Sequence, residues 1–388
     1  APAPPPAAAV AAPGRDRSPP HERLDHLVRR MICCTTFEAL MHDEGARRQR
    51  AWAACYMWKV VSTMGLCPET FESAVAIFDR YHCSQLRKNT SGVHPASFVH
   101  YAAAAAVLVG LDALREVDIS DVIAGREETD ALAALGHLSA ALRGGGVLES
   151  VDLSDNALGE KGVLACAPLL EGQRCLEVLR IRNNGLSAEA AATVRDLLLG
   201  RRSSDDNAAA APPPLRVLSF YNNMSGDGGA HAIAEVVEAC GATLRELVYS
   251  ATRTQPPGCA RFVAALPSAP QLLHLDVSDN TIGPDAAAAL AEALPSCLLS
   301  LSVRDGGLGA EGLAALLRRA AALPSLGTLD VSGHELLAAG EEPLRALLVG
   351  RRATLRELLM DDCELDADGG AVVAAAVDAA AAAAAAAA

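Results

Sequence analysis

Residues 148–162, LESVDLSDNALGEKG, set the pattern for most of this chain. The apolar residues and one amide of this stretch follow a fixed spacing: Leu148, Val151, Leu153, Asn156 and Leu158. The alternation of apolar residues predicts a short strand, and Asn156 is placed to hydrogen-bond the turn after it. The glycines that follow lead into the helical spacing of VLACAPLL. Because one such unit cannot bury its own apolar face, the pattern predicts stacked neighbours.

The same spacing begins again at leucines that are about 28 residues apart, a period typical of leucine-rich repeats. These leucines are Leu114, Leu148, Leu176, Leu215, Leu244, Leu272, Leu298, Leu326 and Leu355. We therefore predict an α/β fold, a leucine-rich-repeat solenoid of the ribonuclease-inhibitor horseshoe type. Its strands line the inner wall, and the polar positions of that wall form the default contact surface.

The sequence divides into four parts by composition. Residues 1–20 are a Pro/Ala-rich tail that is predicted to be disordered. Residues 21–112 have helical spacing, 113–370 carry the repeats, and 371–388 are a poly-Ala tail with no readable chemistry. The insertion RRSSDDNAAAAPPP at 201–214 predicts a surface loop between the third and fourth repeats.

The helical segment 21–112 resembles the first half of a cyclin box. The matching residues are Arg50, Trp52, the run LCPET at 66–70, Ala74-Val75 and FDRY at 78–81. The resemblance implies a kinase as partner, but the lysine-bearing segment that faces the kinase in cyclins is replaced by VGLD at 109–112. The favoured interpretation is a helical cap on the open end of the solenoid, which such stacks need; a kinase or other protein bound through 21–112 is the alternative.

Composition narrows the range of partners. The net charge of −14 and the pI of about 5.2 argue against nucleic acid and favour a partner with a basic face. We find neither a membrane span nor a signal peptide. The 11 cysteines lack paired spacing, which indicates free thiols in a reducing compartment. A cytoplasmic location is therefore expected, with a perinuclear one as its variant.

The first four repeats carry a more specific resemblance. They include LREVDISDVIAGREETDAL at 114–132, LEVLRIRNNGLSAEAA at 176–191 and LRVLSFYNNMSG at 215–226. Together they resemble the leucine-rich domain of Ran GTPase-activating proteins, most of all the plant-type ones. The irregular unit DVIAGR at 121–126 and the doubled amides Asn183-Asn184 and Asn222-Asn223 distinguish them from generic repeats.

The resemblance implies a GTPase activator for a Ran-type small GTPase in its GTP form, acting in nucleocytoplasmic transport. The sequence itself has no G-x-x-x-x-G-K-[ST] loop, no second His at zinc spacing from His334 and no ligand-spaced cysteines, so we predict no active site, cofactor or metal of its own. In that family an asparagine beside the strands orients the glutamine of the GTPase, and an arginine of the first repeat is needed. By motif the arginine is Arg126 and the asparagine is Asn183 or Asn184.

Each of these residues has a structural alternative. Asn184 shares its repeat position with Asn156, Asn223 and Asn280, which favours a role in capping the turn, so Asn183 is preferred. Arg126 could pair with its neighbours Glu127, Glu128 or Asp130 in solvent, where such pairs contribute little stability.

Acidic residues recur along the predicted inner wall. The candidate partner-binding residues are Asp118, Asp152, Asp155, Asn222, Asp276 and Asp279, and Asp330 and Asp361 follow the same pattern. A wall of one sign would speed the encounter with a basic partner, although a merely solvated face is the alternative.

The alternative function is a repeat scaffold that binds a protein partner without activating it.

Overall fold

The computed structural model describes residues 115–123, 127–142, 147–202, 211–335, 338–351 and 353–363, with a few positions between 370 and 378. The expectations for the tail 1–20, for the cyclin-like segment 21–112 with its kinase partner, and for most of 371–388 lie outside these residues. Of the insertion at 201–214, residues 203–210 also lie outside. All described residues belong to one compact unit, Leu111–Ala388.

Short parallel strands form the front layer of this unit. They are β1 (Glu116–Asp118), β2 (Ser150–Asp152), β3 (Val178–Arg180), β4 (Val217–Ser219), β5 (Glu246–Val248), β6 (His274–Asp276), β7 (Ser300–Ser302), β8 (Thr328–Asp330) and β9 (Glu357–Leu359). Each strand pairs with the next in sequence, so the sheet has the order β1 to β9. The register places equivalent repeat positions side by side, as in the pairing of Val117 with Val151 and of Val151 with Leu179.

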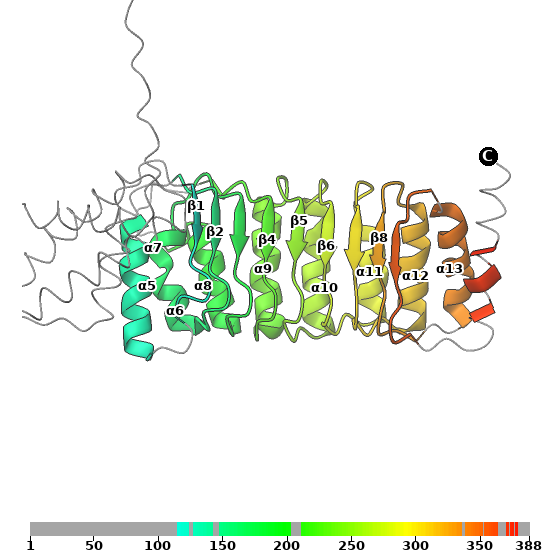
Figure 1. The fold of residues 1–388 in the computed structure, drawn as a ribbon, viewed down its shortest axis with the longest axis horizontal. Helices are drawn as coiled ribbons and strands as arrows, with labels where there is room; N and C mark the ends of the chain where they lie inside the picture. Colours follow the sequence, from blue (N-terminus) through cyan, green and yellow to red (C-terminus); the bar gives the residue numbers. More distant parts are fainter. Residues whose placement is uncertain are drawn as a thin grey trace, which may run out of the picture. The chain divides into compact units, whose positions relative to one another are not determined.

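Helices form a second layer behind the strands (Figure 1). They are α5 (Glu128–Leu142), α6 (Gly159–Ala165), α7 (Ala167–Leu170), α8 (Ala188–Leu198), α9 (Gly226–Cys240), α10 (Pro256–Ala265), α11 (Pro284–Ala293), α12 (Gly309–Ala322) and α13 (Ala338–Arg351), with the 3-10 helix η2 (Leu266–Ser268) after α10. The helical half of the second repeat is divided in two, because Pro168 opens α7 and cannot continue the hydrogen bonding of α6. This alternation of parallel strands and helices confirms the predicted solenoid.

The leucines that open the repeats lie between the two layers. Leu148, Leu176, Leu215, Leu244, Leu272, Leu298 and Leu326 are at most 2% exposed. Leu355 is half-buried in the last repeat, and Leu114 lies outside the described residues. Burying a leucine side chain contributes about 2 kcal/mol, so this column is a main source of stability.

Buried asparagines follow the strands at one repeat position and form an interior ladder, which we define as Asn156, Asn184, Asn223 and Asn280. Asn223 shows how a rung works: its Oδ1 accepts the backbone N–H groups of Asn184 and Leu186, each at 3.2 Å, and its Nδ2 donates to the Ile181 carbonyl at 2.9 Å. The ladder therefore satisfies backbone groups that the tight turns leave unpaired.

Candidate functional site

A surface column runs directly beside the interior ladder, one residue earlier in each repeat. The left-handed column consists of Asp121, Asp155, Asn183, Asn222, Ala251, Asp279, Asp305, Gly333 and Asp362, whose φ angles lie between 50° and 73°. This conformation is tolerated best by Gly, Asn and Asp, which explains why those residue types dominate the column. Ala251 is the exception, and its methyl group carries no polar atom.

The structure separates the two asparagines that the sequence left as alternatives. Asn184 is 1% exposed, its Oδ1 accepts the backbone N–H of Asn156 at 3.0 Å, and its Nδ2 donates to the Leu153 carbonyl at 3.0 Å. Asn183 belongs to the left-handed column and is exposed. Of the two, only Asn183 has its side-chain amide at the surface.

The amide of Asn183 is held in place although it lies in solvent. Its Nδ2 donates to Asp155 Oδ1 at 2.9 Å, and its Oδ1 accepts from Asn222 Nδ2 at 2.9 Å. Three of the predicted site residues, Asp155, Asn183 and Asn222, are thus brought together in one chain of hydrogen bonds. We call this chain the amide chain.

The predicted aspartates of the strand ends brace the turns that follow them. Asp118, Asp152, Asp276 and Asp330 each accept, at 2.9 to 3.0 Å, the backbone N–H of the serine two residues later. Loss of hydration raises the pKa of Asp279, and the neighbouring carboxylate of Asp305 raises it further. These aspartates therefore contribute to the fold as well as to the charge of the surface.

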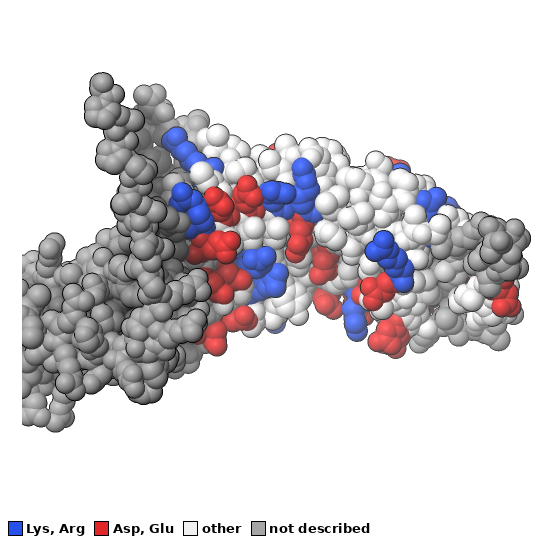
Figure 2. Space-filling model, turned by 45° about the horizontal axis from the view of Figure 1, so that its top comes forward, with Lys and Arg blue, Asp and Glu red and all other residues white. Residues whose placement is uncertain are grey.

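The sequence predicted that the strand wall carries charge of one sign only. The structure instead places basic side chains on this wall as well. Arg180 pairs in register with Asp152, and Arg182 lies two residues further along. Arg182 is fixed there, since its Nε donates to the Ser219 hydroxyl at 2.7 Å. Figure 2 shows basic and acidic side chains interleaved along the stack. The prediction of a uniformly acidic wall is therefore wrong, because strand β3 supplies Arg180 between Asp152 of β2 and Ser219 of β4.

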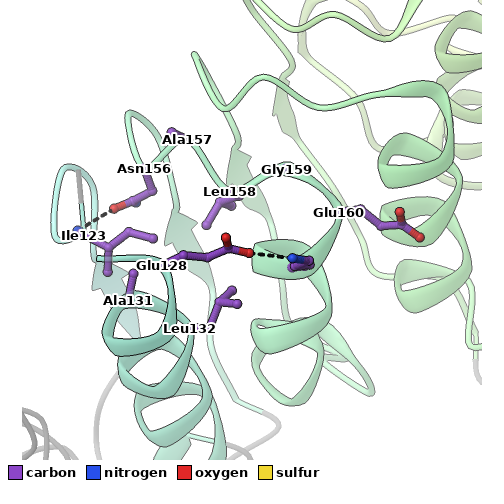
Figure 3. Close-up of a pocket in the computed structure, with 10 residues that line it drawn as sticks. Ile123, Glu128, Ala131, Leu132, Asn156, Ala157, Leu158, Gly159 and Glu160 are labelled. Atoms are coloured by element: carbon purple, nitrogen blue, oxygen red, sulfur yellow. Dashed lines mark hydrogen bonds and ion pairs between the residues drawn. The ribbon is translucent and has the colours of Figure 1, made fainter. Parts of the chain in front are cut away.

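Arg126 lies outside the described residues, but the chain on either side of it is fixed. The backbone N–H of Ile123 donates to Asn156 Oδ1 at 3.1 Å, and Glu128 pairs with Lys161 at 2.6 Å (Figure 3). The Glu128 carboxylate also raises the pKa of Lys161. These residues line a cavity of about 510 Å³ between the first two repeats. Ile123 and Glu128, the described residues near Arg126, thus both contact the second repeat.

Two exposed residues that are candidates for partner contact were not predicted from the sequence. Tyr221 and Met224 are 42% and 56% exposed next to Asn222 and Asn223. The signal was present, because Tyr221 occupies the repeat position that is serine in Ser154, Ser250, Ser278 and Ser332. A large, exposed aromatic side chain at a position that is serine in four other repeats favours a contact over a packing role.

Within the described residues, no group of three or more His, Cys, Asp or Glu side chains could hold a metal ion. The same part of the chain contains no helix that is both long and apolar enough to cross a membrane.

Comparison with known proteins agrees with the fold. The family model described as "Leucine Rich repeat" matches residues 147–165 and 269–291. Ribonuclease inhibitor of Sus scrofa is 27% identical over 239 residues, which are 61% of this chain and 48% of that protein. The chain is a leucine-rich-repeat solenoid, as its repeats and its sheet indicate.

A shorter stretch shows higher identity to two Arabidopsis thaliana proteins. RAN GTPase-activating protein 2 is 53% identical over 68 residues, and RAN GTPase-activating protein 1 is 51% identical over 77 residues. The matches cover 18% and 20% of this chain but only 12% and 14% of those two relatives. The chain is therefore similar to Ran GTPase-activating proteins over about a fifth of its length.

Proposed function

We propose that this chain is a GTPase-activating protein for a Ran-type small GTPase in its GTP form. It binds the GTPase through the strand wall and the part of the left-handed column that holds Asp155, Asn183 and Asn222, and it contributes no active site of its own. The proposal draws on the short stretch of about half-identical sequence shared with two RAN GTPase-activating proteins. A cytoplasmic location belongs to the same proposal.

The observation that carries this proposal is the fixed amide of Asn183. An exposed asparagine side chain ordinarily loses rotamer entropy when it binds a partner. Here two hydrogen bonds of 2.9 Å hold it before any partner arrives. A preorganised amide can align a catalytic group of the GTPase at little further cost, and alignment of reacting groups is a large source of rate acceleration.

The neighbours of Asn183 suit a protein surface. Arg182 precedes Asn183 in sequence, and the Tyr221 carbonyl accepts the Asn183 backbone N–H at 2.8 Å; both residue types are enriched where proteins bind one another. The acidic residues Asp118, Asp152, Asp276 and Asp279 lie further along the wall and are available for a basic surface of the GTPase.

The first test is multiple-turnover GTP hydrolysis by purified Ran, with this protein at a small fraction of the Ran concentration. We expect acceleration by the unaltered protein and loss of most of it in Asn183→Gly. Glycine tolerates the φ of 51° at this position, so the substitution removes the amide without straining the turn. The matched control is Asp305→Gly, at the same column position with a φ of 50°.

Binding to Ran loaded with a non-hydrolysable GTP analogue separates the two functional classes. Binding without acceleration would replace the proposal with a non-catalytic repeat scaffold. Absence of both, from folded protein, would remove Ran as the partner. Equal acceleration by Asn183→Gly and the unaltered protein would keep the activity but reject the assigned residue.

A further inference from the structure

Two arginines stand close together on the strand wall at the third repeat. Arg180 ends strand β3, and Arg182 follows two residues later, so both side chains leave the same face of the strand, about 7 Å apart along it. Both residues are half-buried. Two guanidinium groups at this spacing repel each other unless negative charge lies near both of them.

The described part of the chain does not supply that charge through an ion pair. Asp152 lies beside Arg180 in the register, but its Oδ1 accepts the backbone N–H of Ser154 at 2.9 Å. Among the described residues, no carboxylate forms an ion pair with Arg180 or with Arg182. The positive charge of this pair is therefore available to a partner.

The equivalent arginine of the seventh repeat is paired within the protein. Arg304 occupies the same repeat position as Arg182, and its Nε lies 3.2 Å from Asp305 Oδ2. The hydrogen bond to Asp305 and its charge raise the pKa of Arg304. The third repeat has the uncharged Asn183 where the seventh has Asp305, so Arg182 lacks this neighbouring carboxylate.

The Arg182 guanidinium is oriented before any partner binds. Its Nε donates to Ser219 Oγ at 2.7 Å, and Ser219 is fully buried. The backbone N–H of Arg182 donates to Ser154 Oγ at 3.2 Å, which fixes the base of the side chain. Nη1 and Nη2 donate to no group of the described residues. Most of the entropy cost of ordering this long side chain is thus met on folding rather than on binding.

The surrounding charges favour a carboxylate over a phosphate as the ligand of this pair. Asp152 lies beside Arg180, and Asp155 is bonded to the amide of Asn183, the residue after Arg182. These carboxylates, together with the net charge of −14, repel a dianionic phosphate or a nucleic-acid backbone more strongly than a single carboxylate. The planar fork of a guanidinium also matches the two oxygens of a carboxylate.

We propose that Arg182, assisted by Arg180, binds an aspartate or glutamate side chain on the surface of a protein partner. This inference rests on the proposed function, in which the partner is a Ran-type GTPase. Arg182 contacts the carboxylate of the partner, and Ser219 positions Arg182. The wall then requires an acidic group of the partner opposite β3 and accepts basic groups opposite Asp152 and Asp276, a pattern that selects among partners by charge.

Arg182→Ser tests the proposal with little risk to the fold, because serine occupies this repeat position in Ser154, Ser250, Ser278 and Ser332. We expect Kd for Ran loaded with a non-hydrolysable GTP analogue to rise about thirtyfold, as for the loss of a hydrogen bond to a charged group. The kcat of activated hydrolysis at saturating Ran and the thermal midpoint should hold. Arg182→Lys keeps the charge without the fork and should raise Kd about tenfold.

The matched control is Arg304→Ser, at the same repeat position. Its guanidinium already has a carboxylate partner in Asp305, so Kd should change less than about threefold. An equal loss of affinity in Arg304→Ser and Arg182→Ser would show that overall charge, and not a specific contact, governs binding, and would overturn the inference.

A double-mutant cycle identifies the carboxylate of the partner. Surface Asp→Asn and Glu→Gln variants of Ran are measured against the unaltered protein and against Arg182→Ser. One of them should weaken binding to the unaltered protein but cause no further loss with Arg182→Ser. If no acidic residue of Ran couples to Arg182 in this way, the inference is wrong.

The remaining outcomes separate this inference from the proposed function. If the unaltered protein neither binds nor activates Ran, the proposed function falls and this inference falls with it. If Arg182→Ser binds and activates Ran as well as the unaltered protein does, the inference is overturned and the proposed function stands. If Arg182→Ser lowers kcat while Kd holds, the arginine acts on the phosphates of the nucleotide, and the inference is overturned as well.

Discussion

Asn184 Oδ1 accepts the backbone N–H of Asn156 at 3.0 Å, although 28 residues separate the two in sequence. One repeat thus completes the hydrogen bonding of the repeat before it. The interior ladder couples neighbouring repeats in this way, while the amide chain, one residue away, faces solvent.

Asn184→Ala should lower the free energy of unfolding by about 2 kcal/mol, because it leaves the buried Asn156 N–H without a partner and removes one of the two donors to the Leu153 carbonyl. Urea denaturation followed by circular dichroism measures the change. In the exposed neighbour, Asn183→Gly should shift the same quantity by less than about 1 kcal/mol. Equal effects at both positions would contradict the distinction between interior ladder and surface column.

Tyr249 should be more sensitive to truncation than to loss of its hydroxyl. Its ring stacks on Phe262 and Phe220 with centroid distances of 4.6 and 5.9 Å, and it is 1% exposed. Tyr249→Ala should cost about 4 kcal/mol of stability through the cavity it leaves. Tyr249→Phe should cost about 1 kcal/mol, since the Thr254 hydroxyl keeps its bond to Thr252. Thermal and urea unfolding of both variants measure these losses of stability. A larger loss in Tyr249→Phe than in Tyr249→Ala would contradict the prediction.

Buried thiols should make the protein less stable in alkali. Burial raises the pKa of Cys166, Cys240 and Cys259 from 9.0 to about 12. Above pH 9 the unfolded chain therefore releases thiol protons that the folded chain retains, so stability is full below pH 9 and falls as the pH rises towards 12. Urea unfolding at pH 8, 9 and 10 should show the decline, and Cys166→Ala should flatten it.

The same thiols should resist modification in the folded state. Cys175 is exposed, whereas Cys166, Cys240 and Cys259 are buried. Mass spectrometry after brief treatment with a thiol reagent at pH 8 should find Cys175 modified before Cys166, Cys240 and Cys259. Early labelling of Cys166 would show that the second repeat opens readily.

Arg126→Ala should reduce GTPase activation without loss of the fold, because the flanking residues Ile123 and Glu128 keep their own contacts with the second repeat. Turnover of Ran measures the effect. Glu127→Ala is the control for the alternative in which Arg126 only pairs with a neighbouring carboxylate. If the two variants lose equally little activity, the arginine has no functional role.

The repeat period was enough to predict the fold. The spacing of leucines located the buried column correctly because every repeat buries the same position against its neighbours, as Leu148 and Leu176 do. The shared repeat position of Asn184 also predicted its capping role. Both results depend on spacing within one repeat, which the sequence displays directly.

The surface could not be predicted in the same way, because it depends on which side chains become neighbours across repeats. Asp155, Asn183 and Asn222 are 28 and 39 residues apart, and the insertion between the third and fourth repeats makes the two intervals unequal. Arg180 interrupts the acidic wall because the register places it between Asp152 and Ser219. The roles of Arg126 and Asn183 came from the family resemblance, and activity measurements are needed to establish them.

The single carboxylate at the start of the amide chain also bears on docking orientation. A stack of nearly equivalent repeats offers a partner many similar binding positions. Shifted or reversed binding modes would therefore differ little in binding free energy. Asp155 removes that ambiguity locally, since donors point towards it and the free acceptor lies at the opposite end. A partner whose donors and acceptors match the direction of this chain can bind at one place and in one orientation along an otherwise repetitive surface.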